Sequence, residues 1–158
     1  MAGVPIYRTP ILADWIDYNG HLRDAYYGLI LSYATDALLD RIGLEASYRE
    51  RTGYSLYTVE MHIHYLHEVK KSDIAVVTVR IIAADHKRIH VAFDLLREGQ
   101  PEAAATAEVM LLSVHQGPTV TTQPFAAEVR AAIDELQRAS AAMPPSGPGS
   151  RRMELRGR

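Results

Sequence analysis

The sequence Asp17-Tyr18-Asn19-Gly20-His21 stands just before a long apolar run at residues 24–42. Residues 4–15, ahead of it, have the pattern of an extended segment, and the apolar run has the three-and-four spacing of a helix. We therefore expect these five residues on a turn that leads from a strand into a helix. The first amides of a helix have no partner inside it and carry partial positive charge, so this turn would adjoin an electropositive helix end.

This turn combines groups that an acyl-transfer reaction needs. A carbonyl oxygen that becomes negative during hydrolysis is stabilised by unpaired helix amides, and Asp17 brings a carboxylate to the same place. A structural role is the alternative, because Asp, Asn and Gly are common turn residues whose side chains bond the nearby backbone. Asn19 and His21, taken alone, are more often structural hydrogen-bonding residues than catalytic ones.

The composition is that of an ordinary single-domain globular protein. Its 158 residues are 47% hydrophobic and 23% charged, with a formal net charge of -2, which favours neither a nucleic-acid partner nor a membrane surface. No stretch reaches the roughly 18 apolar residues of a membrane span, and no leader pattern is apparent. Cysteine is absent from the sequence, so disulfides and thiolate chemistry are excluded. We expect a cytoplasmic protein.

Periodicity predicts an α+β protein in which one helix precedes four strands and a second helix. The first helix is apolar around most of its circumference, with Asp24 as its N-cap and Gly43 as its stop. Short turns between the later strands predict an antiparallel sheet that curls around this helix. The expected strands are 55–69, 74–84, 88–97 and 103–115, and the second helix is 125–139. Residues 1–142 form the predicted domain, and 143–158 a loose tail rich in Pro, Gly and Arg.

Several motifs in this order resemble one enzyme family. They are Asp14-Trp15-Ile16-Asp17-Tyr18-Asn19-Gly20-His21, Tyr26-Tyr27, Tyr57-Thr58-Val59-Glu60 and Tyr65-Leu66-His67-Glu68-Val69. With them, residues 4–138 resemble the hotdog-fold acyl-CoA thioesterases of the 4-hydroxybenzoyl-CoA thioesterase type. The resemblance implies the hotdog fold, in which an antiparallel β-sheet wraps around a long central helix. The stretch at 34–40 adds a similarity to the betainyl-CoA thioesterases of carnitine degradation.

The resemblance implies a catalytic site at the turn. By this resemblance, Asp17 attacks the thioester carbonyl or activates a water, the backbone amide near Asp24 holds the oxyanion, and CoA leaves as a thiolate. Gly20 permits close backbone approach, while Asn19 and His21 order the loop or polarise the carbonyl.

The resemblance also implies an assembly of subunits. Family members form dimers whose active sites lie at the subunit interface, so we expect a homodimer or a homotetramer. One departure from the family pattern is Arg23, because members commonly have Asn at this position, two residues after the His.

Tyrosine is concentrated in the first half of the chain, where all nine residues lie between Tyr7 and Tyr65. Aromatic rings bind quaternary ammonium groups, and a betainyl group ends in one. Core packing is the competing explanation for these rings. The candidates for binding the substrate are Trp15, Tyr18, Tyr27, Tyr54, Tyr57 and Tyr65, with Glu60 as a counter-charge.

A basic pair in a predicted turn, Lys87 and Arg88, is the candidate for binding the phosphates of CoA. His62, His64 and His67 raise the question of a zinc site, but no established ligand spacing completes it. We therefore predict no metal and no cofactor, with the CoA thioester serving as substrate.

The predicted function is hydrolysis of a small acyl-CoA, with betainyl-CoA giving betaine and CoA as the preferred reaction. Two alternatives remain open on the sequence. A hotdog hydratase or dehydratase acting on acyl thioesters would share acid and base work between His and a helix Glu, yet residues 24–44 contain no Glu. A non-catalytic module would bind a cationic or CoA ligand in the aromatic pocket.

Overall fold

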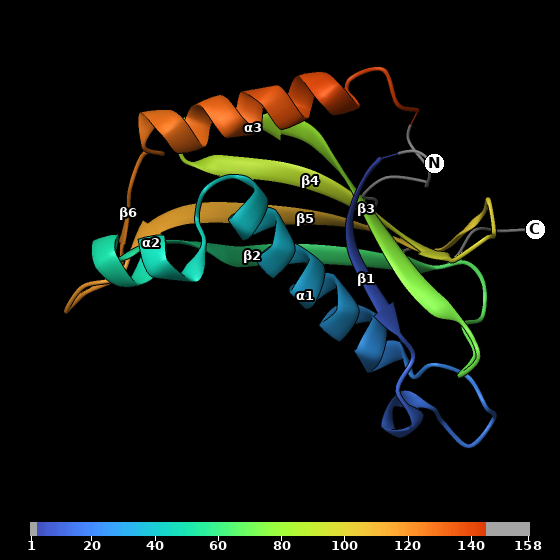
Figure 1. The fold of residues 1–158 in the computed structure, drawn as a ribbon. Helices are drawn as coiled ribbons and strands as arrows, with labels where there is room; N and C mark the ends of the chain where they lie inside the picture. Colours follow the sequence, from blue (N-terminus) through green and yellow to red (C-terminus); the bar gives the residue numbers. More distant parts are fainter. Residues whose placement is uncertain (1–2, 145–158) are drawn as a thin grey trace, which may run out of the picture.

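A computed structural model describes residues 3–144 of the chain (Figure 1). The predicted tail at 143–158 lies almost wholly outside the described residues, so the domain boundary remains a prediction. The elements in chain order are β1 (Val4–Pro10), the 3-10 helix η1 (Ala13–Trp15), α1 (Asp24–Arg41), α2 (Ala46–Thr52), β2 (Tyr54–Tyr65), β3 (Ile74–Ala84), β4 (Arg88–Arg97), β5 (Ala103–His115), β6 (Thr121–Thr122) and α3 (Ala127–Ser140).

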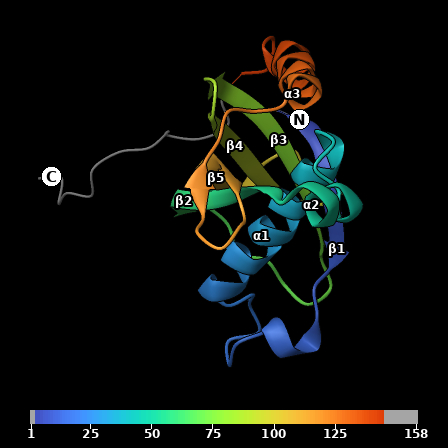
Figure 2. The same ribbon diagram turned by 90° about the vertical axis from the view of Figure 1, so that its left-hand side faces the viewer.

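The strands form one antiparallel sheet in the order β1-β3-β4-β5-β2, with the short β6 beside β5. The sheet curls around α1, which lies against its concave face in both ribbon views (Figures 1 and 2). This arrangement confirms the predicted α+β architecture. The antiparallel pairing of consecutive strands that the short turns predict is present for β3, β4 and β5, whereas β2 pairs with β5 and forms an outer edge of the sheet.

The core lies between α1 and the concave face of the sheet. Alternate residues of β4 are buried there, while His90 and Ala92 on the opposite face are half-buried. A large apolar side chain that is fully removed from water contributes about 1.5–3 kcal/mol to stability. Fully buried members of this core include Ile30, Leu31, Ala34 and Leu38 on α1 and Ile89, Val91, Phe93 and Leu95 on β4.

Helix α1 ends as predicted but begins one residue earlier than its predicted cap implies. Gly43 follows its last turn with a φ of 85°, a left-handed conformation that favours glycine. Arg23 occupies the N-cap position without a side-chain cap, and Asp24 is the first helical residue. The prediction of Asp24 as N-cap was therefore wrong: its carboxylate instead accepts a hydrogen bond from the adjacent Ala25 amide at 2.9 Å.

Two further boundaries differ from the sequence prediction, and one helix was not predicted. The extended segment at 4–15 is a strand only as far as Pro10, and η1 follows it. Strand β2 ends at Tyr65, because the Leu66 and His67 amides both donate to the Ala104 carbonyl and turn the chain away. Helix α2 was not predicted, since none of its residues is buried and it has no apolar stripe to detect.

Helix α3 covers the part of β3 that β1 leaves unpaired. The pairing of β1 with β3 stops at Val79, and beyond it the Ile81 amide donates to the Ser140 hydroxyl of α3 at 3.2 Å. Val129 and Ile133 on α3 are buried in the core, which confirms the amphipathic second helix. None of the described helices is long and apolar enough to cross a membrane.

Candidate active site

The segment between η1 and α1 is a closed turn built on the side chain of Asp17. The Asp17 amide donates to the His21 carbonyl at 2.8 Å, and the Gly20 amide donates to the Asp17 carbonyl at 3.1 Å. One carboxylate oxygen, Oδ1, accepts the amides of Asn19 at 2.8 Å and His21 at 3.1 Å. Gly20 has a φ of 83°, so glycine is favoured there. The structural interpretation of these turn residues is thus correct, and it leaves Oδ2 of Asp17 for chemistry.

The hydrogen bonds of this turn also set the ionisation of Asp17. The bond from the His21 amide is the main cause that lowers the pKa of this carboxyl, and the Asn19 amide lowers it further, while burial opposes both. Amide donors stabilise the charged form of a carboxylate more than its neutral form. Asp17 is therefore an anion at neutral pH, held in a fixed orientation by the backbone that follows it.

The start of α1 is tied to this turn by backbone hydrogen bonds. The Leu22 amide donates to the Val69 carbonyl at 2.7 Å, and the Arg23 amide donates to the Trp15 carbonyl at 3.0 Å. The Ala25 amide is used by the Asp24 carboxylate. Within the described part of the chain, no hydrogen bond engages the Asp24 amide. This amide can donate to a bound oxygen at the positive end of the helix.

A pocket of about 310 Å³ opens beside the first turn of α1. Two tyrosines shape it: the rings of Tyr27 and Tyr65 meet edge to face at 90°, with centroids 5.2 Å apart. The Tyr27 hydroxyl donates to the His67 carbonyl at 3.4 Å, and the Tyr65 hydroxyl donates to the Asp24 carbonyl, also at 3.4 Å. The pocket is lined by His21, Leu22, Asp24, Tyr27, Tyr65, Leu66, His67 and Glu68.

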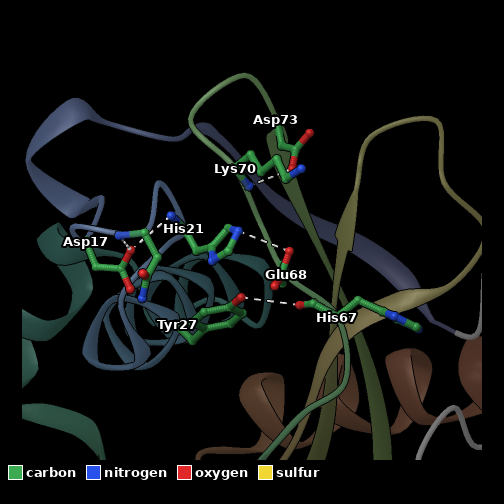
Figure 3. A network of polar contacts seen from close by, with 8 residues as sticks. Asp17, His21, Tyr27, His67, Glu68, Lys70 and Asp73 are labelled. Atoms are coloured by element: carbon green, nitrogen blue, oxygen red, sulfur yellow. Dashed lines mark hydrogen bonds and ion pairs between the residues drawn. The ribbon is translucent and has the colours of Figure 1, made fainter.

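The side chains of His21 and Glu68 meet at this pocket, as Figure 3 shows. Nε2 of His21 lies 3.1 Å from Oε2 of Glu68, and a backbone bridge between His21 and Lys70 brings the two segments together. Asp17 lies on the side of His21 away from Glu68 (Figure 3) and does not line the pocket. The pocket and the Asp17 carboxylate therefore flank the same imidazole.

Two polar residues of this pocket, His67 and Glu68, were not among the predicted site residues. Both entered the sequence argument only in the question of a metal site and as part of a family motif. Both follow the end of β2, and their proximity to His21 depends on the way the chain leaves the sheet. The one available signal was the motif Tyr65-Leu66-His67-Glu68-Val69, which carried the family resemblance.

The predicted aromatic candidates do not gather in one place within the chain. Trp15 is buried and stacks on Tyr26, with ring centroids 5.6 Å apart. Tyr18 is 92% exposed at the tip of the turn. Of the predicted rings, the structure brings only Tyr27 and Tyr65 together in the pocket beside α1.

The remaining aromatic candidates lie near the other end of β2. Tyr54 packs edge to face on His115, with centroids 5.4 Å apart. The hydroxyl of Tyr57 accepts a hydrogen bond from Gln116 Nε2 at 3.1 Å. Both tyrosines are paired with the end of β5, opposite the end at which Tyr65 pairs with Ala105.

Glu60 belongs to a different surface. It lies 2.9 Å from Nε2 of His62 and lines a separate cavity of about 180 Å³ with His62, His90 and Glu108. Alternation along β2 puts Glu60 and His62 on the sheet face opposite Met61 and Ile63, which pack against the core. The described residues contain no group of three or more His, Asp or Glu side chains arranged to hold a metal ion.

The predicted phosphate-binding pair lies in the turn between β3 and β4. The Lys87 and Arg88 amides both donate to Oδ1 of Asp85, and the Arg88 guanidinium bonds Oδ2 at 2.8 Å and 2.6 Å. The Lys87 amide is the main cause that lowers the pKa of Asp85, and Arg88 adds to it. This turn is at the end of β3 remote from Asp73 and the active-site turn. Within one chain, the pair therefore lies about a strand's length from Asp17.

Comparisons with a family model and with individual proteins both identify thioesterases. Residues 11–146 match the model of the thioesterase-like superfamily. The chain is 46% identical over 145 residues to the betainyl-CoA thioesterase of Pseudomonas aeruginosa, covering 90% of each protein. It is 43% identical over 109 residues to an L-carnitine dehydrogenase/betainyl-CoA thioesterase of Agrobacterium fabrum, covering 69% of this chain and 22% of that longer protein.

Two solved structures have the same fold. One is the protein SAV2348 from Staphylococcus aureus in complex with CoA, with a TM-score of 0.87 and 27% identity over 98% of both chains. The other, from Pseudomonas putida KT2440, has a TM-score of 0.84 and 39% identity over 99% of both chains. The predicted hotdog fold is confirmed. The chain therefore belongs to the thioesterase-like superfamily and is a thioester hydrolase.

Proposed function

We propose that the protein hydrolyses betainyl-CoA to betaine and free CoA. The observation that carries this proposal is the 46% identity to a betainyl-CoA thioesterase across nearly the whole of both chains. At this level of identity the fold is shared. Because CoA thioesters are intracellular metabolites, the proposed location is the cytoplasm.

The pocket beside α1 supports a betainyl group as the acyl part of the substrate. This group ends in a trimethylammonium ion, which is permanently charged and has no N–H to donate. Such ions are bound by the faces of aromatic rings and by nearby negative charge. Tyr27 and Tyr65 supply the rings, and their hydroxyls are occupied by backbone carbonyls, so they present aromatic surface to the pocket.

In the proposed reaction, Asp17 provides the attacking oxygen, either itself or through a water molecule that it activates. If Asp17 attacks directly, its oxygen bonds to the thioester carbonyl carbon, the C–S bond breaks, and a water then hydrolyses the resulting anhydride. If it activates a water, the carboxylate accepts the proton of that water as the new C–O bond forms and the C–S bond breaks. In both cases CoA leaves as a thiolate. The Asp24 amide stabilises the negative carbonyl oxygen, and the His21 imidazole polarises it. Asn19 and Gly20 contribute by holding the turn in the shape that fixes Asp17.

We further propose that the active enzyme is a dimer paired along β2. This strand has 12 residues, and among the strands that the structure describes only β5 pairs with it, along one edge. A long unpaired edge is a template for another strand. Antiparallel pairing of β2 with its copy places the Tyr57 end of the partner subunit beside the Tyr65 end of this chain. The proposed CoA-phosphate contacts, Lys87 and Arg88, then reach the site of the other subunit.

The dimer is tested with two matched substitutions. Val59 lies in a bulge of β2 and is 55% exposed, whereas Val120 is 48% exposed in the loop before β6. A lysine on an edge strand opposes edge-to-edge pairing, so Val59→Lys is expected to give a monomer of low activity and Val120→Lys an unchanged enzyme. Sedimentation velocity measures both, and an assembled, active Val59→Lys variant would contradict the proposed interface.

The substrate is tested by measuring free-thiol release across a panel of acyl-CoA compounds. Betainyl-CoA is expected to give the highest kcat/KM, and its carbon isostere tert-butylacetyl-CoA a lower value because it lacks the charge. The second compound has the same shape, so the comparison isolates the cation. Absence of thiol release from betainyl-CoA would reject the proposed substrate.

A further inference from the structure

The pocket beside α1 has a negative character. Two carboxylates line it, but that of Asp24 is engaged by the Ala25 amide at the start of the helix. The Glu68 side chain is 63% exposed, and only its Oε2 contacts His21. Among the described residues, Oε1 of Glu68 has no hydrogen-bond partner. Asp24 and Glu68 therefore each keep one carboxylate oxygen without a hydrogen bond among the described residues, and Glu68 is the one that also contacts His21.

The charge of Glu68 acts on Tyr27, and that of Asp24 acts on Tyr65. Burial is the main cause that raises the pKa of the Tyr27 hydroxyl, and the Glu68 carboxylate raises it as well. Arg97 opposes this effect at Tyr27, but it does not line the pocket. A third carboxylate, Glu102, has its Oε2 3.8 Å from Nε2 of the lining residue His67. No lysine or arginine is among the lining residues.

We infer that Glu68 is the specificity-determining residue for the charge of the acyl group: its carboxylate faces the trimethylammonium ion while the Tyr27 and Tyr65 rings enclose the methyl groups. This inference rests on the proposed function and replaces Glu60 as the counter-charge. Glu60 is bound to His62 on the other face of the sheet, so its charge does not face the pocket of the same chain. The contact of Glu68 with His21 places the cation and the catalytic turn on the two sides of one imidazole.

The carbon isostere separates the charge of Glu68 from its shape. Betainyl-CoA and tert-butylacetyl-CoA fill the same volume, but only the first has a charge for Glu68 to attract. In Glu68→Gln, kcat/KM for betainyl-CoA is expected to fall about tenfold, as for loss of one partly screened charge at short range. The kcat/KM for tert-butylacetyl-CoA is expected to stay within about twofold, since a glutamine fills nearly the same space.

A matched control removes a carboxylate outside the pocket. Glu98 pairs with Arg8 at 2.8 Å on the surface, so Glu98→Gln changes the net charge equally. It is expected to leave the preference for betainyl-CoA unchanged. Glu68→Asp, which keeps a shorter carboxylate, is expected to retain part of the preference and provides a second variant if glutamine impairs folding.

The outcomes distinguish this inference from the proposed function. A wild-type enzyme without preference for betainyl-CoA over its isostere would overturn both. A wild-type preference that persists in Glu68→Gln, or equal losses for the two substrates, would overturn the role of Glu68 alone. Equal losses would assign Glu68 to positioning His21, and the pH profile of kcat would then shift for both substrates.

Discussion

The Oδ1 atom of Asp17 accepts the His21 amide at 3.1 Å, so the proposed attacking carboxylate and the imidazole beside the pocket belong to one hydrogen-bonded turn. The side chain that performs the chemistry also holds the turn together. A substitution at Asp17 therefore affects two properties, and the choice of replacement separates them.

Asp17→Asn is expected to abolish most hydrolysis while preserving the fold. Asparagine keeps an oxygen that can accept the Asn19 and His21 amides, but it loses the anion. Thiol release from betainyl-CoA is expected to fall by about 10³-fold, within the range for loss of a catalytic carboxylate, with little change in Tm. Asp17→Ala removes the acceptor as well and is expected to lower both activity and Tm. Full activity in Asp17→Asn would contradict the proposed mechanism.

The ionisation of Asp17 predicts how stability depends on pH. Its pKa is lowered in the folded protein, chiefly by the His21 amide, so the native state binds this proton less tightly than the unfolded chain. The resulting stabilisation is fully present above the unfolded value, about 3.9, and is lost as pH falls towards the folded pKa. The difference in unfolding free energy between wild type and Asp17→Asn is thus expected to be constant from pH 7 to about 5 and to shrink below about 4. A difference that changes above pH 5 would contradict this.

Tyr65 is expected to recognise the cation through its ring. It is 53% exposed, so its replacement disturbs the core little. Tyr65→Leu is expected to raise the KM for betainyl-CoA about fivefold, as for loss of one partly exposed cation–π contact. Tyr65→Phe keeps the ring, loses only the bond to the Asp24 carbonyl, and should resemble the wild type. An equal effect of Tyr65→Leu on tert-butylacetyl-CoA would show that the ring contributes packing alone.

Two glycines are expected to respond to alanine in opposite directions. Gly20 has a φ of 83°, and a side chain in this left-handed region costs about 1–2 kcal/mol. Gly28 is inside α1, where an added Cβ would meet only Ile63 Cδ1 at 3.9 Å, so alanine there should stabilise by about 0.5–1 kcal/mol. Urea unfolding measures both, and similar shifts for the two variants would contradict the assigned backbone roles.

The sequence predicted those parts of the fold that depend on local pattern. Alternation on β4 identified the face with Val91 and Phe93, and the apolar spacing of α1 identified the central helix. The pairing of β2 with β5 was beyond such reasoning, because it joins strands separated by two others in the chain. Helix α2 escaped because it buries nothing.

The candidate site was predictable to the extent that it is local in sequence. Asp17, Asn19 and Gly20 belong to one turn. The preference of Asp, Asn and Gly for turns predicts their position without tertiary information. Glu68 was missed because its approach to His21 depends on where β2 stops and how the chain returns to β3. The six aromatic candidates are concentrated in the first half of the sequence but do not lie together in space. The strand β2 alone, with 12 residues, separates its two ends by about 40 Å.

The same strand, β2, carries Tyr65 at the pocket and presents the unpaired edge on which the proposed dimer depends. Evolution towards a different acyl group would change residues next to the proposed dimer interface. Relatives that have diverged in substrate are therefore expected to differ in quaternary arrangement as well, and chimaeras that exchange β2 alone should transfer both traits at once.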